Sequence, residues 1–294
     1  MPTQSTPLAL TAGDPSGIGP EIALQAWLLR ERFAVPAFYL LSDPALVETR
    51  ARLLGLRVDI KVVTPGEALN TFGSALPVVP LDNAFLDQPG EPDTVNAAGT
   101  IEAIERAVTD VTSGKAAAVV TCPIAKKPLY DAGFGYPGHT EFLAELCRGA
   151  GPAPLPVMML AHEAFRVVPL TIHIPLADVP RTITPKLLAD TIRITAKDLQ
   201  KRFGIARPSI AVTGLNPHAG EDGSIGREEV EIIRPTINAL AQEGLNVSGP
   251  YSADTLFYPP HWQHHDAVVA MYHDQALIPI KTLAFDAGVN VTLG

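Results

Sequence analysis

Residues 267–284 read Ala-Val-Val-Ala-Met-Tyr-His-Asp-Gln-Ala-Leu-Ile-Pro-Ile-Lys-Thr-Leu-Ala and carry the pattern on which the fold depends. The short apolar run at 267–272 predicts a buried strand. Polar residues beginning at His273 predict a loop, and a helix is expected over 275–284, interrupted or kinked by the proline at position 279. A strand followed by a loop and a helix is the repeating unit of an α/β protein with a parallel sheet.

The same succession continues along most of the chain. We expect further strands at 7–12, 37–41, 58–63, 116–120, 156–161, 166–172 and 209–213. We expect helices at 18–32, from position 43 onward, and at 94–113, 139–147, 185–203 and 226–243. Strands 156–161 and 166–172 predict a hairpin, and residues 72–92, rich in proline and glycine, predict a loop or a strand with loops. The alternation predicts an α/β fold with a mainly parallel sheet and helices on both faces.

Composition limits the classes of protein that fit. The 294 residues are enough for one large α/β unit or two lobes, and 47% hydrophobic residues can form a sizeable core. No apolar stretch approaches the ~20 residues that span a bilayer, and the N-terminus has no secretory signal pattern. A net charge of −9 disfavours nonspecific nucleic-acid binding. Two cysteines, Cys122 and Cys147, are typical of a reducing compartment, so we expect a cytoplasmic protein without membrane or nucleic-acid partners.

Three histidines stand just after expected strands. His173 lies in Leu-Thr-Ile-His-Ile-Pro, His218 in Leu-Asn-Pro-His-Ala-Gly-Glu, and His273 in Met-Tyr-His-Asp-Gln. Strand ends are where open α/β folds bind ligands, and three imidazoles can hold a catalytic divalent metal. The rings would meet if these strands share a sheet or face each other across a dimer. Asp254 and Asp274 are available as oxygen ligands or as partners of the histidines, although Asp254 also suits a helix cap.

Two turns before expected helices are candidate anion sites. Gly-Asp-Pro-Ser-Gly-Ile-Gly-Pro-Glu at 13–21 could direct N–H groups at an anion, but it lacks the third glycine of a dinucleotide fingerprint. A tight turn with Ser16 as the helix cap is the alternative. His139 and Thr140, in Gly-His-Thr-Glu at 138–141, suit a phosphate or carboxylate, and a plain helix cap is the alternative.

Two polar residues interrupt apolar segments near the end of the chain. Lys281 either extends to solvent or meets an anion. Asn290 lies in the strand-like Gly-Val-Asn-Val-Thr, where a buried amide without a partner is costly, so we expect a functional role for it.

Six motifs in this order closely resemble the family of 4-hydroxythreonine-4-phosphate dehydrogenases of the pyridoxal phosphate pathway. Two of them are the turns at 13–21 and 138–141. The others are Asn-Pro-His-Ala-Gly-Glu at 216–221, Ser-Ala-Asp-Thr at 252–255, Tyr-His-Asp-Gln at 272–275 and Gly-Val-Asn-Val-Thr-Leu-Gly at 288–294. The match extends from near residue 8 to residue 294, and the motifs together are highly specific.

The resemblance implies the isocitrate/isopropylmalate dehydrogenase-like fold, with two α/β/α lobes and a cleft between them. It places the first lobe at 1–125 plus 275–294, and the second lobe, with the dimer interface, at 126–274. It also implies a homodimer in which both subunits contribute to one active site. NAD binding in that fold needs no dinucleotide fingerprint.

The resemblance further implies residue roles and a reaction. NAD or NADP would oxidise 4-phosphohydroxy-L-threonine, and decarboxylation would give 3-amino-2-oxopropyl phosphate. The divalent metal would be zinc, magnesium, cobalt or manganese, with imidazole ligands favouring a transition metal. Asp254 is our choice for a proton acceptor or outer partner, and Lys281 could pair with an anion or relay a proton. The implied metal ligands are His173, His218 and His273, and the implied substrate contacts are His139, Thr140, Lys281 and Asn290.

Three other functions remain open at this point. A related dehydrogenase acting on threonate or erythronate 4-phosphate shares these motifs, and a metal hydrolase could use a three-histidine zinc site. A phosphotransacetylase-like acyltransferase shares the broad fold but needs no set of three histidines. Family members usually continue beyond Gly294 with a stretch that includes a substrate-contacting arginine. The present sequence stops before that stretch.

Overall fold

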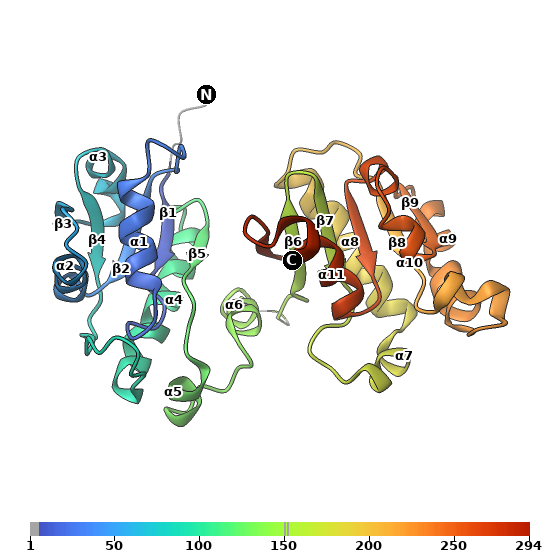
Figure 1. The fold of residues 1–294 in the computed structure, drawn as a ribbon, viewed down its shortest axis with the longest axis horizontal. Helices are drawn as coiled ribbons and strands as arrows, with labels where there is room; N and C mark the ends of the chain where they lie inside the picture. Colours follow the sequence, from blue (N-terminus) through green and yellow to red (C-terminus); the bar gives the residue numbers. More distant parts are fainter. Residues whose placement is uncertain (1–5, 150, 152) are drawn as a thin grey trace. The chain divides into compact units, whose positions relative to one another are not determined.

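The computed structural model describes residues 6–149, 151 and 153–294. The chain divides into two compact units, one ending at Ala153 and the other running from Pro154 to Gly294. We call them the N-terminal and C-terminal units; Figure 1 draws them from blue to green and from yellow-green to red. Within the described ranges, no helix is long and apolar enough to cross a membrane.

The N-terminal unit is built on a parallel sheet of five strands in the order β3-β4-β2-β1-β5. The strands are β1 (Leu8–Thr11), β2 (Phe38–Ser42), β3 (Ile60–Val62), β4 (Leu76–Pro80) and β5 (Val119–Thr121). Successive side chains of β2 alternate between the two faces: Leu40 packs in one buried cluster, and Tyr39 and Leu41 pack in another. Both faces of this sheet are therefore covered, as expected from its continuous apolar strands.

Helices cover both faces of the five-stranded sheet. Buried residues of α1 (Gly19–Leu28) and α2 (Pro44–Leu53) join the cluster around Leu40. Residues of α4 (Ala97–Thr112) join the cluster around Tyr39, beside the short α3 (Ala68–Phe72). Two further helices, α5 (Lys126–Asp131) and α6 (His139–Leu146), pack against α4 through a cluster that includes Ile104 and Phe142. Short 3-10 turns lie at η1 (Pro65–Glu67) and η2 (Thr94–Asn96).

The C-terminal unit contains a mixed sheet of six strands in the order β11-β6-β7-β10-β8-β9. The strands are β6 (Val157–His162), β7 (Phe165–Pro169), β8 (Ile210–Thr213), β9 (Val247–Tyr251), β10 (Ala267–Ala270) and β11 (Val289–Leu293). The four strands β7, β10, β8 and β9 are mutually parallel. β6 pairs antiparallel with both β7 and β11, which confirms the predicted hairpin.

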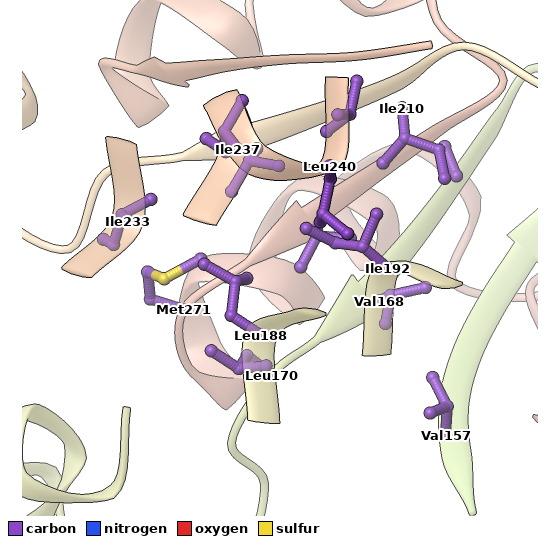
Figure 2. Close-up of a cluster of buried hydrophobic side chains, with 14 of the residues drawn as sticks. Val157, Val168, Leu170, Leu188, Ile192, Ile210, Ile233, Ile237, Leu240 and Met271 are labelled. Carbon is purple, nitrogen blue, oxygen red and sulfur yellow. The ribbon is translucent and has the colours of Figure 1, made fainter. Parts of the chain in front are cut away.

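The two faces of this sheet are also both covered. Val269 of β10 packs in a cluster with α8 (Pro185–Lys201) and α9 (Arg234–Gln242), and its neighbour Val268 packs in a cluster with α10 (Ala253–Leu256) and α11 (His273–Ala284). Figure 2 shows side chains of α8 and α9, including Leu188 and Leu240, in the first cluster. The remaining elements are η3 (Leu176–Asp178), α7 (Val179–Thr182), η4 (Pro217–Gly223), the π-helical η5 (Glu229–Ile233) and η6 (His261–His264).

The lobe boundaries expected from the resemblance stay a prediction. In the observed units, residues 275–294 belong to the C-terminal unit, because β11 pairs with β6 from Val289 opposite Ala161 to Leu293 opposite Val157. Residues 126–149 belong to the N-terminal unit, because α5 and α6 pack on α4. The expectation of a mixed α/β protein is confirmed.

Candidate active site

The three candidate metal ligands all follow the carboxyl ends of strands in the C-terminal sheet. His173 follows β7, His273 follows β10, and His218 follows β8. These strands are adjacent and parallel, in the order β7-β10-β8, so their carboxyl ends point the same way. Of the two arrangements that could unite the rings, the shared sheet is therefore present. This edge is where α/β sheets bind ligands.

His173 and His273 face each other at that edge. Their ring centroids are 5.6 Å apart, with the ring planes inclined by 44°. Nδ1 of His273 lies 2.7 Å from Oδ1 of Asp274, which orients the imidazole and leaves Nε2 as its free nitrogen. Asp274 thus serves as a partner of the histidine. A pair of imidazoles, one of them held by a carboxylate, suits a transition-metal ion.

His218 stands apart from this pair. Among the described residues, no three His, Cys, Asp or Glu side chains come close enough together to hold a metal ion. His218 lies in η4 with a φ of +53° and is exposed. Its charge contributes to lowering the pKa of Asp254, although the main cause is the hydrogen bond that Asp254 accepts from the Ser252 hydroxyl. Asp254 is an exposed residue in the first turn of α10, whose N-cap residue is Ser252.

The half-buried Gln275 and the buried Thr171 connect the three strand ends. Oε1 of Gln275 accepts from the Thr213 hydroxyl at 2.9 Å and from the Met271 N–H at 2.7 Å, and its Nε2 donates to the Gly214 carbonyl at 2.9 Å. The Thr171 hydroxyl donates to the Met271 carbonyl at 2.8 Å. Gln275 therefore ties β10 to β8, and Thr171 ties the chain after β7 to β10. Sequence reasoning included Gln275 in a motif but assigned it no role.

His139 and Thr140 begin α6 in the N-terminal unit. The N-cap residue is Gly138 and makes no side-chain capping bond, so neither residue is the cap proposed as the alternative. Nε2 of His139 is buried and has no hydrogen-bond partner in the described part of the chain. Burial lowers the pKa of His139, and the charge of Lys126 lowers it further. An unpartnered imidazole nitrogen beside a lysine and a helix N-terminus suits an anionic ligand.

Lys126 is a residue that sequence reasoning missed. It begins α5, and a Cβ on Gly138 would lie 3.8 Å from its Nζ. The spacing of 13 positions between Lys126 and His139 contains no periodic signal, so only the packing of α5 and α6 reveals their proximity.

Lys281 and Asn290 are both exposed. Lys281 lines a hollow of about 390 Å³ together with His273 and Asp274, on the outer side of α11. Asn290 lies on β11 opposite Leu160. The cost of burying an amide without a partner therefore does not apply to Asn290, because water can satisfy its exposed side chain, and its functional role stays a prediction. The expectation of a strand around it is correct.

The glycine-rich turn at 13–21 is tight, as the alternative predicted, but Ser16 is not its cap. The N–H of Ser16 donates to Asp14 Oδ1 at 2.7 Å, and its hydroxyl donates to the Glu91 carbonyl at 3.0 Å. A Cβ at Gly13, where φ is +72°, would lie 2.3 Å from the Pro123 carbonyl oxygen, so the chain needs glycine there. The turn is built for close packing of strand β1 on β5.

Comparison with known proteins decides the family. The family model described as "Pyridoxal phosphate biosynthetic protein PdxA" matches residues 34–294. The chain belongs to the PdxA family. A relative from Bradyrhizobium diazoefficiens, named 4-hydroxythreonine-4-phosphate dehydrogenase, is 52% identical over 296 residues, covering 98% of this chain and 86% of the relative.

Solved structures support the PdxA assignment at the level of the fold. The crystal structure of 4-hydroxythreonine-4-phosphate dehydrogenase from Klebsiella pneumoniae is 34% identical, with a TM-score of 0.86, covering 99% of this chain and 88% of that one. The corresponding structure from Burkholderia phymatum is 36% identical, with a TM-score of 0.85 and the same coverage. The resemblance to this PdxA family, drawn from six motifs, is confirmed.

Proposed function

We propose that the chain oxidises 4-phosphohydroxy-L-threonine with NAD or NADP and releases CO₂ to give 3-amino-2-oxopropyl phosphate in pyridoxine 5′-phosphate biosynthesis. The observation that carries this proposal is the 52% identity to a named 4-hydroxythreonine-4-phosphate dehydrogenase over 98% of the chain. The alcohol carbon gives a hydride to the nicotinamide, and the hydroxyl proton goes to a base. The carboxylate then leaves as CO₂, and the electron pair of the broken C–C bond takes up a proton at the amino-bearing carbon. Asp254 is our candidate for that base or for an outer partner of the site.

A divalent metal is the second part of the proposal. His173, His218 and His273 would hold zinc, magnesium, cobalt or manganese. The support is that all three follow adjacent parallel strands, and that His173 and His273 already lie 5.6 Å apart. A cation held there supplies positive charge that lowers the pKa of a hydroxyl and stabilises oxygen anions. Asp274 would fix the orientation of the His273 ring.

The anionic groups of the substrate need cations and N–H groups. We assign one anionic end to His139 and Thr140 at the start of α6, with Lys126 adding positive charge beside His139. Lys281 would pair with phosphate or carboxylate, or relay a proton, and Asn290 would contribute its amide. Exposed positions at both residues leave these groups free to meet a ligand.

The wider arrangement is proposed on the resemblance. It comprises isocitrate dehydrogenase-like lobes with a cleft between them, and a cytoplasmic homodimer whose subunits share each active site. Sedimentation analysis of the full chain tests the dimer: a monomer at assay concentrations would contradict it.

A coupled assay tests the activity. Following NADH or NADPH absorbance with 4-phosphohydroxy-L-threonine should show turnover that a chelator removes and added metal restores. Parallel assays with threonate 4-phosphate and erythronate 4-phosphate test the related substrates, and phosphate release without NAD(P) tests hydrolysis. Turnover confined to the sugar-acid phosphates, or hydrolysis without cofactor, would overturn the proposal.

A further inference from the structure

A buried carboxylate lies behind the segment that carries His218. Glu229 has an exposed fraction of 0%. Its Oε1 accepts from the Asn216 N–H at 2.7 Å, and its Oε2 accepts from Asn216 Nδ2 at 2.9 Å. Glu228 Oε2 accepts from the same Nδ2 at 2.8 Å. Burying a carboxylate is costly, so these bonds have to offset a large desolvation penalty.

Three glycines leave room for the contact between Glu229 and Asn216. A Cβ at Gly214 would lie 2.9 Å from Glu229 Oε1, and one at Gly220 would lie 2.6 Å from Oε2. A Cβ at Gly226 would lie 2.2 Å from Asn216 Nδ2. Glycines at these positions therefore allow the Glu229 and Asn216 side chains to meet at the base of the segment.

The segment held in this way has an unfavourable backbone. Residues 218–222 have φ values of +53°, +52°, +79°, +43° and +52°, and only Gly220 among them is glycine. The left-handed region costs a residue with a Cβ roughly 1–2 kcal/mol. Such a run persists only where its surroundings over-determine it, and it is typical of functional sites. The two bonds from Asn216 to Glu229 fix the chain two residues before His218, where the run begins.

The hydrophobic core fixes Glu229 in turn. Glu229 begins the π-helical η5, which ends at Ile233, and both residues are fully buried. Ile233 belongs to the large core cluster of the C-terminal unit and is labelled in Figure 2. π-helical turns of this kind occur often at functional sites. A path of contacts thus runs from the buried Ile233 and Glu229 through the half-buried Asn216 to the segment that carries the exposed His218.

We propose that Glu229 is a positioning residue for His218 as a metal ligand. It touches neither metal nor substrate; its carboxylate fixes Asn216 and so maintains the left-handed segment that presents the imidazole. The inference rests on the metal set given under Proposed function. The affinity for metal therefore depends on the Glu229 carboxylate, which does not contact the ion and acts only through His218.

The substitution Glu229→Gln tests this with little change in shape. It replaces one acceptor oxygen by an amide donor that faces the Asn216 donor, so one of the two bonds is lost. Titration calorimetry with Mn²⁺ or Zn²⁺ on the full chain, without NAD(P), should give an affinity about 10- to 100-fold weaker, the usual effect of losing a group that orients a ligand. Asn216→Ala keeps the backbone N–H bond to Glu229 Oε1 but removes the side-chain bonds from Nδ2 to Glu229 and Glu228. It should give a similar loss of affinity if Glu229→Gln does not fold. Glu243→Gln, which alters a carboxylate that pairs with Arg193, is the matched control and should bind metal normally.

A double-mutant cycle separates positioning from a general effect on stability. In a His218→Ala background, Glu229→Gln should weaken metal binding no further, because the histidine that it positions is gone. An unchanged metal affinity in Glu229→Gln overturns the inference. An equal loss of metal affinity with and without His218 overturns it as well. Neither result contradicts the three proposed histidine ligands. Normal metal affinity in His218→Ala itself contradicts the proposed metal set, and the inference with it.

Discussion

His139 lies where its protonated form is disfavoured. Burial lowers the pKa of the imidazole, and the nearby positive charge of Lys126 lowers it further. The uncharged ring has one donor and one acceptor nitrogen, and its buried Nε2 has no partner within the described residues. An anion bound between His139 and Lys126 would favour the protonated ring again, so ligand binding and proton uptake should be coupled.

Replacing Lys126 by Met should raise the pKa of His139, because one of the two causes that lower it is removed while burial remains. NMR titration of the histidine signals checks this shift. The KM for the phosphorylated substrate should rise about tenfold, as expected when a charged contact worth ~1.5 kcal/mol is lost. Lys127→Met is the matched control, since Lys127 is exposed and pairs with Asp131. A Lys126→Met variant with the original pKa and KM would contradict the assignment.

Sequence alone predicted the residues whose signal is local. His173 and His273 could be proposed as neighbours because each directly follows an expected apolar strand, and their ring centroids lie 5.6 Å apart. Lys126 and Glu229 could not be found, since their importance depends on which distant residue they contact: His139 and Asn216, respectively. The exposure of Asn290 could not be predicted either, because a strand pattern does not show which strand forms the edge of a sheet.

At the scale of elements, the strand ends are joined by Gln275. Replacing it by Leu should leave the Thr213 hydroxyl and the Met271 N–H without their acceptor. Each unsatisfied buried group costs about 1–3 kcal/mol, so urea unfolding should show a loss of ~2 kcal/mol or more. Metal affinity should fall as well, because β8 and β10 carry His218 and His273. Gln263→Leu, at an exposed position, should leave both quantities unchanged.

Helix α8 covers one face of the C-terminal sheet through Leu188, which is fully buried in the cluster of Figure 2. Leu188→Ala should lower the free energy of unfolding by about 2–5 kcal/mol, because it removes apolar contact and leaves a cavity. Leu187→Ala, at a partly buried position of the same helix, should cost less. If the two variants lost the same free energy of unfolding in chemical denaturation, Leu188 would not be the more buried of the two residues, contrary to the packing of α8 described above.

The strands that sequence patterns missed or left open contain strand-breaking residues. β4 reads Leu-Pro-Val-Val-Pro and β9 reads Val-Ser-Gly-Pro-Tyr, and proline is expected only near strand ends, edges or bulges. β9 is indeed an edge strand, and β4 carries its prolines at positions 77 and 80. The left-handed run at 218–222 could not be predicted either, since four of its residues are not glycine. The pairing of β11 with β6 joins residues more than a hundred positions apart, which local patterns do not reveal.

At the scale of the whole molecule, the candidate site residues belong to two separate units. Lys126, His139 and Thr140 are in the N-terminal unit, whereas the three candidate metal ligands are in the C-terminal unit. Each unit has its own sheet and its own buried clusters. Under the proposed site assignment, the substrate contacts residues of both units, and the two contributing units come either from one chain or from different subunits of a dimer.

Mixing inactive variants distinguishes these possibilities. His139→Ala, His218→Ala and His273→Ala should each abolish turnover alone. If subunits share each site, at least one pairwise mixture, refolded together, should regain about a quarter of the normal rate, because random pairing gives heterodimers with one intact site of two. Refolding each variant with itself is the control and should regain nothing. A site formed within one chain would leave every mixture inactive, because each chain would then carry its own defect into its own site.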